Sequence, residues 1–190
     1  MDSTEATDRL LEAAEDLFYA HGVQAVGMDA VRERSGVSLK RLYQCFPAKN
    51  DLVEAYLLRR DERWRGSLRN FVHARGDDPL AVFAWLKNWF AEPGFRGCAF
   101  INSFGEFGEP PPGIAAAIRK HKDEVRAYLR SLVPDRSVAD QLFALMEGAT
   151  VLAAITGDPR EADTAGEAAK VLLEAHLGVT TPAANRPRSS

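Results

Sequence analysis

The sequence predicts an all-α protein of about nine helices. Apolar residues recur three or four positions apart through most of the chain, and glycine or proline interrupts this pattern at intervals. Three short helical segments come first, with a glycine turn between the second and the third, and longer segments follow. This order predicts a small N-terminal domain, residues 4–64, and a larger helical domain, residues 75–178.

Composition and charge are those of an ordinary globular chain. Of its 190 residues, 46% are hydrophobic and 27% are charged, and the net charge at pH 7 is −3. Two cysteines are too few for a disulfide framework. The acidic N-terminus does not read as a secretory signal, and no apolar run approaches the roughly 18 residues of a membrane span. We therefore expect a cytoplasmic protein, in which any nucleic-acid site needs locally concentrated positive charge.

The first expected helix is amphipathic and ends at a glycine. Its apolar positions recur at helical spacing and are Leu10, Leu11, Ala14, Leu17 and Phe18. Ser3 or Thr4 can cap its start, and Gly22 ends it just past His21. This helix is expected to pack on the short helices that follow.

The next segments have the layout of a helix–turn–helix. A short helix is expected from Met28 to Ser35, and Gly36 breaks it. Ser38 is a suitable N-cap for a third short helix that ends before Pro47. A long fourth helix follows from Lys49 to about Phe71. Short helices joined by a glycine turn are typical of motifs that dock in the major groove of DNA, and this segment extends from about Gly27 to Phe46.

Basic residues concentrate on this motif. From position 32 to position 49 the chain has one acidic residue, Glu33, and five basic ones: Arg32, Arg34, Lys40, Arg41 and Lys49. A second basic run, 59–69, is interrupted by Asp61 and Glu62. The exposed side of the third helix is expected to carry Ser38, Leu39, Lys40, Arg41 and Gln44. Lysine and arginine bond guanine, glutamine pairs with adenine, and leucine contacts the thymine methyl. A solvated helix face on a small bundle is the alternative.

The spacing of glycine, apolar and polar residues in segment 4–64 resembles that of a known family. The positions that carry the resemblance are Gly22, Gly27, Met28, Val31, Ser35, Gly36, Val37, Ser38, Leu42, Tyr43, Phe46, Lys49 and Leu52. With these residues, the segment resembles the DNA-binding domain of the TetR (tetracycline repressor) family. The resemblance implies an all-α homodimer in which each C-terminal domain binds a small molecule. It also implies that ligand binding moves the two DNA-reading domains apart and releases the operator, with repression as the usual outcome.

The resemblance also assigns roles to individual residues. It implies that Tyr43 and Lys49 contact phosphate and that Lys40 and Arg41 face the bases. The complete set of expected DNA contacts is Gly27, Met28, Ser38, Leu39, Lys40, Arg41, Tyr43, Gln44 and Lys49. Four positions depart from the family pattern: Gly27, Arg32, Ser35 and Cys45. Gly27 stands where serine or threonine usually caps the second helix, so a side-chain phosphate contact is lost there.

The C-terminal segment is expected to contain five further helices. They begin near Pro79 after a cap by Asp77 or Asp78, and then cover about 98–107, 114–132, 138–156 and 161–177. Aromatic and polar residues on them form a candidate ligand pocket: Trp85, Trp89, Phe100, Asn102, Phe104, Phe107, His121, Met146 and Thr150. Aromatic walls with a few polar groups are typical of small-molecule sites. Plain core packing is the alternative for each aromatic residue.

The last two helices are expected to form a homodimer interface. They carry stripes of small and apolar residues, with interface candidates Leu142, Leu145, Ala149, Leu152, Ala153, Ala165, Ala169, Leu172 and His176. Two such helices from each subunit make a four-helix bundle, although packing within one subunit is the alternative. A dimer would place two reading helices about 34–36 Å apart, which predicts a palindromic operator. Residues 179–190 are expected to be a disordered tail.

Neither an enzyme nor a metalloprotein is expected. The four histidines are scattered, no metal-binding or phosphate-loop motif occurs, and no cofactor is expected. Catalysis by Cys98 would need His121 nearby in space, which the sequence does not show. A redox-responsive regulator that senses through Cys45 or Cys98 is the other hypothesis, since Arg96 lies close to Cys98 in sequence. Each cysteine can equally be a small buried apolar residue.

Overall fold

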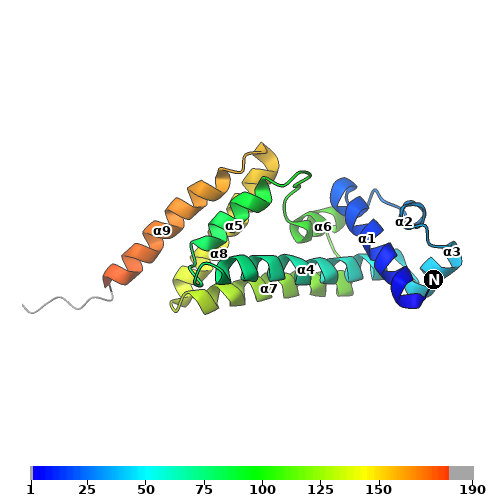
Figure 1. Ribbon diagram of the computed structural model, residues 1–190, viewed down its shortest axis with the longest axis horizontal. Coiled ribbons are helices and arrows are strands. Elements are labelled where there is room, and N and C mark those ends of the chain that lie inside the picture. The colour runs from blue at the N-terminus through cyan, green and yellow to red at the C-terminus, as the bar shows by residue number, and fades with distance from the viewer. Residues whose placement is uncertain (1, 180–190) are drawn as a thin grey trace, which may run out of the picture.

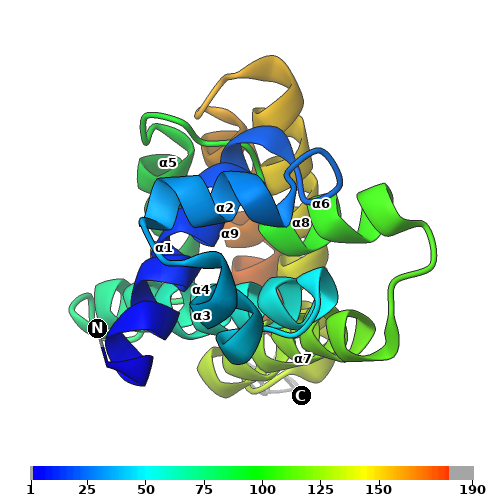
Figure 2. The ribbon, with the colours of Figure 1, turned by 90° about the vertical axis from the view of Figure 1, so that its right-hand side faces the viewer.

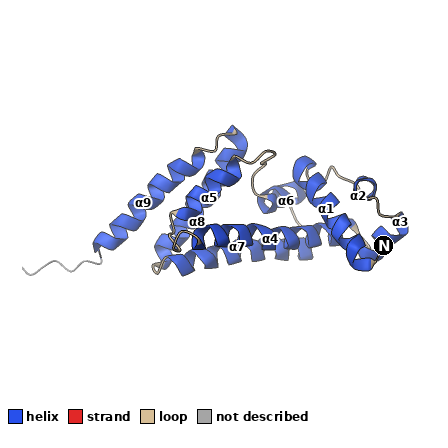
Figure 3. Ribbon diagram, viewed as in Figure 1, coloured by secondary structure: helices blue, strands red, loops and turns tan. Residues whose placement is uncertain are grey.

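The computed structural model describes residues 2–179, and this part of the chain is helical with no strand (Figure 3). The predicted all-α fold class is confirmed, and the described residues form nine helices. Their bounds are α1 Ser3–His21, α2 Met28–Ser35, α3 Leu39–Cys45, α4 Lys49–His73, α5 Ala81–Phe90, α6 Ala99–Phe107, α7 Pro112–Leu132, α8 Arg136–Thr156 and α9 Glu161–Val179. Of the predicted tail, only Val179 lies inside this part, so the rest of that prediction lies outside the described residues.

Several helix starts differ from the predicted ones, and α8 is one of them because it begins at Arg136, after a cap by Asp135, and not near Val138. Asp2 caps α1 in place of Ser3 or Thr4, because its carboxylate accepts a hydrogen bond from the Thr4 amide at 2.8 Å. α5 begins at Ala81, because Pro79 and Leu80 lie in a tight turn whose amide bonds reach only three residues back. α7 begins two residues early, at Pro112, since proline at the first turn has no amide that needs a partner.

Two helices run the length of the molecule. α4 and α7 lie side by side along the long axis, with α1–α3 at one end and α5, α8 and α9 at the other (Figure 1). α4 has 25 residues, which corresponds to a length of about 37 Å. Seen from the α1–α3 end, α6 lies beside the short helices on the side of α8 (Figure 2). Along the long axis, α6 lies between α1 and α5 (Figure 1).

The buried apolar residues form two cores. The first gathers α1–α3 on the first half of α4, where Leu52, Val53 and Leu57 are buried. It also includes Phe100 of α6 and Ile114 of α7, so it extends beyond the predicted segment 4–64. The second core joins α5, α8 and α9 to the last half of α4 and α7. α4 thus contributes to both cores.

A buried ionic cluster on α4 and α7 lies between the two cores. The Asp61 carboxylate accepts two bonds from the Arg65 guanidinium at 2.7 Å each, and its Oδ1 lies 2.7 Å from Nδ1 of His121. Asp61 is 2% exposed and His121 is 3% exposed. The contact between Asp61 and His121 therefore joins α4 to α7 in the interior, where a buried charge needs a partner.

Among the described helices, α8 is long and apolar enough to cross a membrane by length and composition, which the sequence reading did not anticipate. Seven of its residues are buried against neighbouring helices, including Leu142, Phe143 and Met146. A helix in the middle of a packed core has the same composition as a membrane span. The apolar character of α8 is therefore accounted for in part by the second core.

Candidate nucleic-acid interface

The turn between α2 and α3 has the geometry expected from its sequence. Gly36 ends α2 in the left-handed conformation, with φ +66°, and its amide bonds the Arg32 carbonyl at 3.0 Å. Ser38 then caps α3, where its hydroxyl accepts a bond from the Arg41 amide at 3.4 Å. Val37 and Leu42 are buried behind the turn. The turn and the core residues together fix the orientation of α3.

α3 presents large apolar and polar side chains to solvent. Leu39 is 49% exposed and Tyr43 is 48% exposed, although large apolar side chains are usually buried. Lys40 and Gln44 are exposed beside them. We call these four residues the α3 face. Arg41, at its edge, is half-buried and donates to the Gln44 side chain at 3.4 Å.

The start of α2 lacks a side-chain cap. Gly27 occupies the N-cap position with φ −86° and ψ 162°, and no side-chain hydrogen bond is made there. Met28 is half-buried and packs on the first core. Both residues were predicted to contact DNA. Gly27 can do so only through its backbone, and part of the Met28 side chain is buried in the first core.

Lys49, at the start of α4, is half-buried beside the loop that follows α1. Its ammonium group donates to the Gln24 carbonyl at 3.3 Å. Burial lowers the pKa of Lys49, whereas the nearby Glu106 carboxylate acts in the opposite direction. Lys49 is therefore connected both to the helix–turn–helix and to α6.

Most other arginines near this interface are neutralised by acidic residues of the same chain. Arg34 bonds Asp16 at 2.8 Å. In the second basic run, Arg60 and Arg63 share Glu15, at 3.2 and 2.8 Å. These pairs hold α4 on α1. Within residues 2–179, by contrast, no acidic side chain forms an ion pair with Lys40.

The predicted ligand-pocket residues are only partly brought together. Trp85, Trp89, Phe100 and His121 meet around Trp64, and the Phe100 and His121 rings stack at 3.7 Å. The cavity at Trp89, Phe100 and His121 measures about 10 Å³, which is the size of one water molecule. The others lie elsewhere. Met146 and Thr150 are buried in α8, Phe107 is half-buried, Phe104 is 56% exposed, and Asn102 lines a separate cleft between α1 and α6.

Cys98 lies in a polar cluster that its sequence neighbours did not reveal. The Lys122 ammonium lies 3.5 Å from its Sγ and also bonds Glu147 at 2.6 Å. Burial raises the pKa of the Cys98 thiol, but a hydrogen bond with His121 and the charge of Lys122 outweigh it, so the pKa is lowered. Burial lowers the pKa of His121, but hydrogen bonds with Asp61 and Cys98 outweigh it, so that pKa is raised. Within the described residues, no three potential ligands form a metal site.

The predicted dimer residues divide into two groups. Leu142, Ala149, Ala153, Ala165 and Ala169 are buried in the second core of their own subunit. Leu145, Leu172 and His176 are half-buried, and His176 lies 3.6 Å from Asp135. Leu152 is 49% exposed, next to three exposed residues that the sequence stripe missed: Val151, Ile155 and Val171. A groove of about 520 Å³ lies between α8 and α9 beside them.

A helix–turn–helix on an all-helical body defines a class of DNA-binding regulatory proteins. Comparison with known proteins supports this class. The sequence profile of "Bacterial regulatory proteins, tetR family" matches residues 10–56. Two solved structures are similar over nearly the whole fold. SCO4454, a TetR-family transcriptional regulator from Streptomyces coelicolor, is 28% identical, with a TM-score of 0.78 over 90% of this chain and 96% of that chain. Residues 10–56 therefore match the TetR-family DNA-binding domain, and the fold as a whole is similar to that of TetR-family regulators.

Two further relatives agree with this assignment. A putative TetR transcriptional regulator (sav143) from Streptomyces avermitilis is 27% identical, with a TM-score of 0.74 over 90% of this chain and 97% of that chain. The HTH-type transcriptional activator FasR of Mycolicibacterium smegmatis is 33% identical over 86 residues. That match covers 45% of this chain and 39% of FasR, so this chain aligns with well under half of its relative's length.

Proposed function

We propose that this protein binds a palindromic operator as a homodimer and represses transcription until a small molecule releases it. The observation that carries the DNA-binding part is the α3 face. Leu39, Lys40, Tyr43 and Gln44 are exposed on a helix whose opposite side is fixed in the first core. Base edges and phosphates are the partners that such side chains fit. This function places the protein in the cytoplasm, where bacterial DNA lies.

Mobility-shift and footprinting experiments on its own promoter region test DNA binding. The affinity should fall steeply with salt, because phosphate contacts release counterions. Lys40→Ala, Arg41→Ala and Gln44→Ala should each cost about 1–3 kcal/mol of operator binding if they contact bases. Lys49→Ala should weaken all DNA sequences alike and reduce the salt dependence.

Lys120→Ala is the matched control for these variants, because Lys120 is an exposed lysine on α7, away from α3. It should leave operator affinity unchanged. If Lys40→Ala binds operator as tightly as Lys120→Ala does, the assignment of Lys40 is wrong. If no duplex from the promoter region shifts at low salt, the proposed function itself fails.

The homodimer is supported by the apolar surface on α8 and α9. Leu152, Ile155 and Val171 are between 49% and 75% exposed, and an apolar groove adjoins them. Contiguous apolar surface of this kind marks an interaction site. A second copy of the same surface fits it best, because a two-fold contact would also pair two α3 helices for one palindrome.

A reporter fusion tests the sign of regulation. Repression predicts that deletion of this regulator raises transcription from an operator-containing promoter. FasR is named as an activator, so lower transcription after deletion is the contrary outcome and would overturn the repressor part of the proposal.

Redox response through Cys98 is the second candidate function. The Lys122 ammonium and the His121 ring stabilise its thiolate, which is the reactive form. Hydrogen peroxide would convert the thiol to a sulfenic acid with release of water. Peroxide should then weaken operator binding in the wild type and in Cys45→Ser, but not in Cys98→Ser. Equal sensitivity of the wild type and Cys98→Ser would exclude this function.

A further inference from the structure

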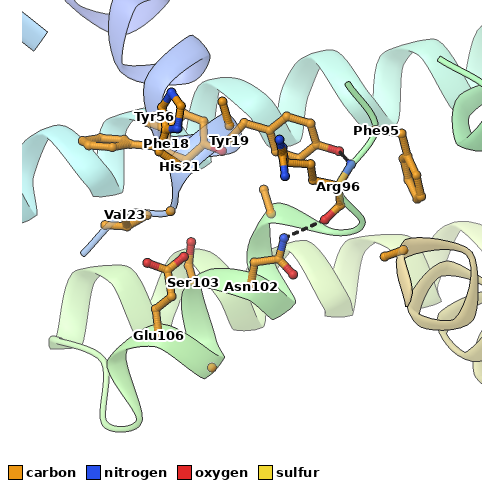
Figure 4. Close-up of a pocket in the computed structure, with 15 residues that line it drawn as sticks. Phe18, Tyr19, His21, Val23, Tyr56, Phe95, Arg96, Asn102, Ser103 and Glu106 are labelled. Atoms are coloured by element: carbon orange, nitrogen blue, oxygen red, sulfur yellow. Dashed lines mark hydrogen bonds between the residues drawn. The ribbon is translucent and has the colours of Figure 1, made fainter. Parts of the chain in front are cut away.

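The cleft between α1 and α6 is a candidate binding site outside the predicted pocket. It has a volume of about 610 Å³, within the range of small-molecule sites. One wall is the end of α1 and the turn after it, the other is α6, and Phe95 and Arg96 lie at one end (Figure 4). The predicted pocket, by contrast, has space for only one water molecule. Of the two, only the cleft can accept an organic ligand without rearrangement.

Two sets of hydrogen bonds join the walls of this cleft. The Tyr19 hydroxyl donates to the Gly97 carbonyl at 2.9 Å and accepts from the Arg96 amide at 3.0 Å. On the α6 side, the Glu106 carboxylate accepts from the Gln24 amide at 2.8 Å. The same Gln24 residue accepts a bond from Lys49 through its carbonyl. A short chain of contacts therefore links α6 to a residue expected to bind phosphate.

The polar groups of the cleft define the chemistry of its ligand. The Arg96 guanidinium lies beside Tyr19, and within residues 2–179 it forms no ion pair (Figure 4). Glu106, in contrast, already accepts the Gln24 amide and lies near Lys49. The Arg96 end of the cleft therefore has a positive charge without an ion-pair partner among the described residues, which favours an anion there, whereas Glu106 places a negative charge on the α6 wall. Carboxylates and phosphates are anions that a guanidinium binds in two-bond geometry, and a carboxylate brings the smaller negative charge towards Glu106.

Ser103 lies on the α6 wall of the same cleft, and the residue is 2% exposed. Its hydroxyl can donate a hydrogen bond to a ligand or accept one from it. Four aromatic residues also line the cleft: Phe18, Tyr19, Tyr56 and Phe95. Phe18 and Tyr56 are buried, and Tyr19 and Phe95 are half-buried.

We propose that this cleft binds a small organic carboxylic acid, with its carboxylate on Arg96 and its body along the cleft past Tyr19 towards Ser103. The ligand would contact both walls, and displacement of Glu106 from Gln24 would release the contact that holds Lys49. By linkage, such a ligand and operator DNA weaken each other's binding. This second step rests on the proposed function, whereas the binding step does not.

Calorimetric titration of the full chain with benzoate and hexanoate tests the binding step directly. Benzamide and hexanamide are the uncharged controls. We expect saturable binding of at least one acid, with at least a tenfold loss in Arg96→Gln and recovery in Arg96→Lys. Arg119→Gln, an exposed arginine on α7, is the matched control and should bind as the wild type does. Ser103→Ala should reduce affinity less than Arg96→Gln does.

Two results would overturn the inference. One is that neither acid binds at millimolar concentration, and the other is that Arg96→Gln binds the acids as tightly as Arg119→Gln does. The same acid should then weaken operator binding of the wild type but not of Arg96→Gln. Absence of any operator binding would refute the proposed function and leave the calorimetric result intact, so the two failures are distinguishable.

Discussion

Gly36 shows how one residue determines the shape of the motif. Its φ of +66° lies in the left-handed region, which side chains with a Cβ rarely adopt. A Cβ built on Gly36 meets nothing within 4 Å, so there is space for a side chain. The requirement for glycine here is therefore purely conformational.

Replacement of Gly36 separates conformational strain from steric clash. Gly36→Ala should lower the free energy of unfolding by about 1–2 kcal/mol, the cost of the left-handed conformation. Gly36→Asn should cost less despite its larger side chain, because asparagine tolerates this region. Urea denaturation measures both values. If Asn costs more than Ala, space rather than φ limits this position.

The Asp61 cluster makes stability depend on pH. Burial raises the pKa of Asp61, but bonds from His121 and Arg65 hold it well below its usual range. The contribution of Asp61 is present above its ordinary pKa of 3.8 and is lost as the pH falls through the lowered folded pKa. The contribution of His121 has the opposite sign. It is present below 6.5 and is lost as the pH rises through the raised folded pKa.

Thermal melts at several pH values test the sign of the His121 contribution. Wild-type Tm should fall as the pH rises above 6.5, and His121→Gln should remove that slope. Asp61→Asn should lower the free energy of unfolding by about 3–5 kcal/mol at neutral pH, because Arg65 and His121 lose their buried partner. Lys87→Gln, which breaks an exposed pair with Asp163 at 2.7 Å, is the control and should cost no more than about 1 kcal/mol. A wild-type slope that His121→Gln retains would contradict the assignment.

At the scale of elements, α2 begins without a side-chain N-cap. Gly27 has backbone angles that serine also adopts at an N-cap, and a Cβ there meets nothing within 4 Å. A serine hydroxyl could accept the free amides of the first turn, which glycine cannot. Glycine at position 27, where serine or threonine is usual, therefore makes the N-terminus of α2 less stable.

Gly27→Ser should therefore stabilise the protein by a few tenths of a kcal/mol, about the difference between these two caps. The added hydroxyl should also strengthen operator binding through a phosphate, equally for all sequences. Chemical denaturation and mobility shifts measure the two effects. Gly66→Ser, at a half-buried glycine within α4, is the control for operator binding and should leave operator affinity unchanged. Weaker operator binding in Gly27→Ser would mean that Gly27 lies in direct contact with the DNA backbone.

Local signals explain why some elements were predictable and others were not. α2 and the cap of α3 were predicted to the residue because Gly36 and Ser38 act through bonds to near neighbours. The contacts that form the cleft join residues far apart in sequence. Tyr19 and Gly97 are 78 positions apart, and Gln24 and Glu106 are 82 apart. Such pairings depend on how helices pack, which periodicity alone does not determine.

At the scale of the whole molecule, the exposed apolar side chains on α8 and α9 predict its assembly. Ile155→Glu should prevent association, because a charge would be buried where Ile155 is now 75% exposed. Light scattering should give roughly twice 20.9 kDa for the wild type and the single-chain mass for the variant. Operator affinity should fall with it. Phe104→Ser, at an exposed aromatic residue on α6, is the control and should remain dimeric. A monomeric wild type at micromolar concentration would contradict the proposed interface.

The shared first core has a consequence for how such regulators can recombine. Phe100 and Ile114 complete the packing around α1–α3, although they follow the helix–turn–helix by more than fifty positions. A chimera that exchanges only residues 4–64 with a relative would join two surfaces that never packed together. α6 and the first half of α7 would have to be exchanged together with residues 4–64. A new operator specificity acquired by domain exchange would therefore bring part of the C-terminal helices with it.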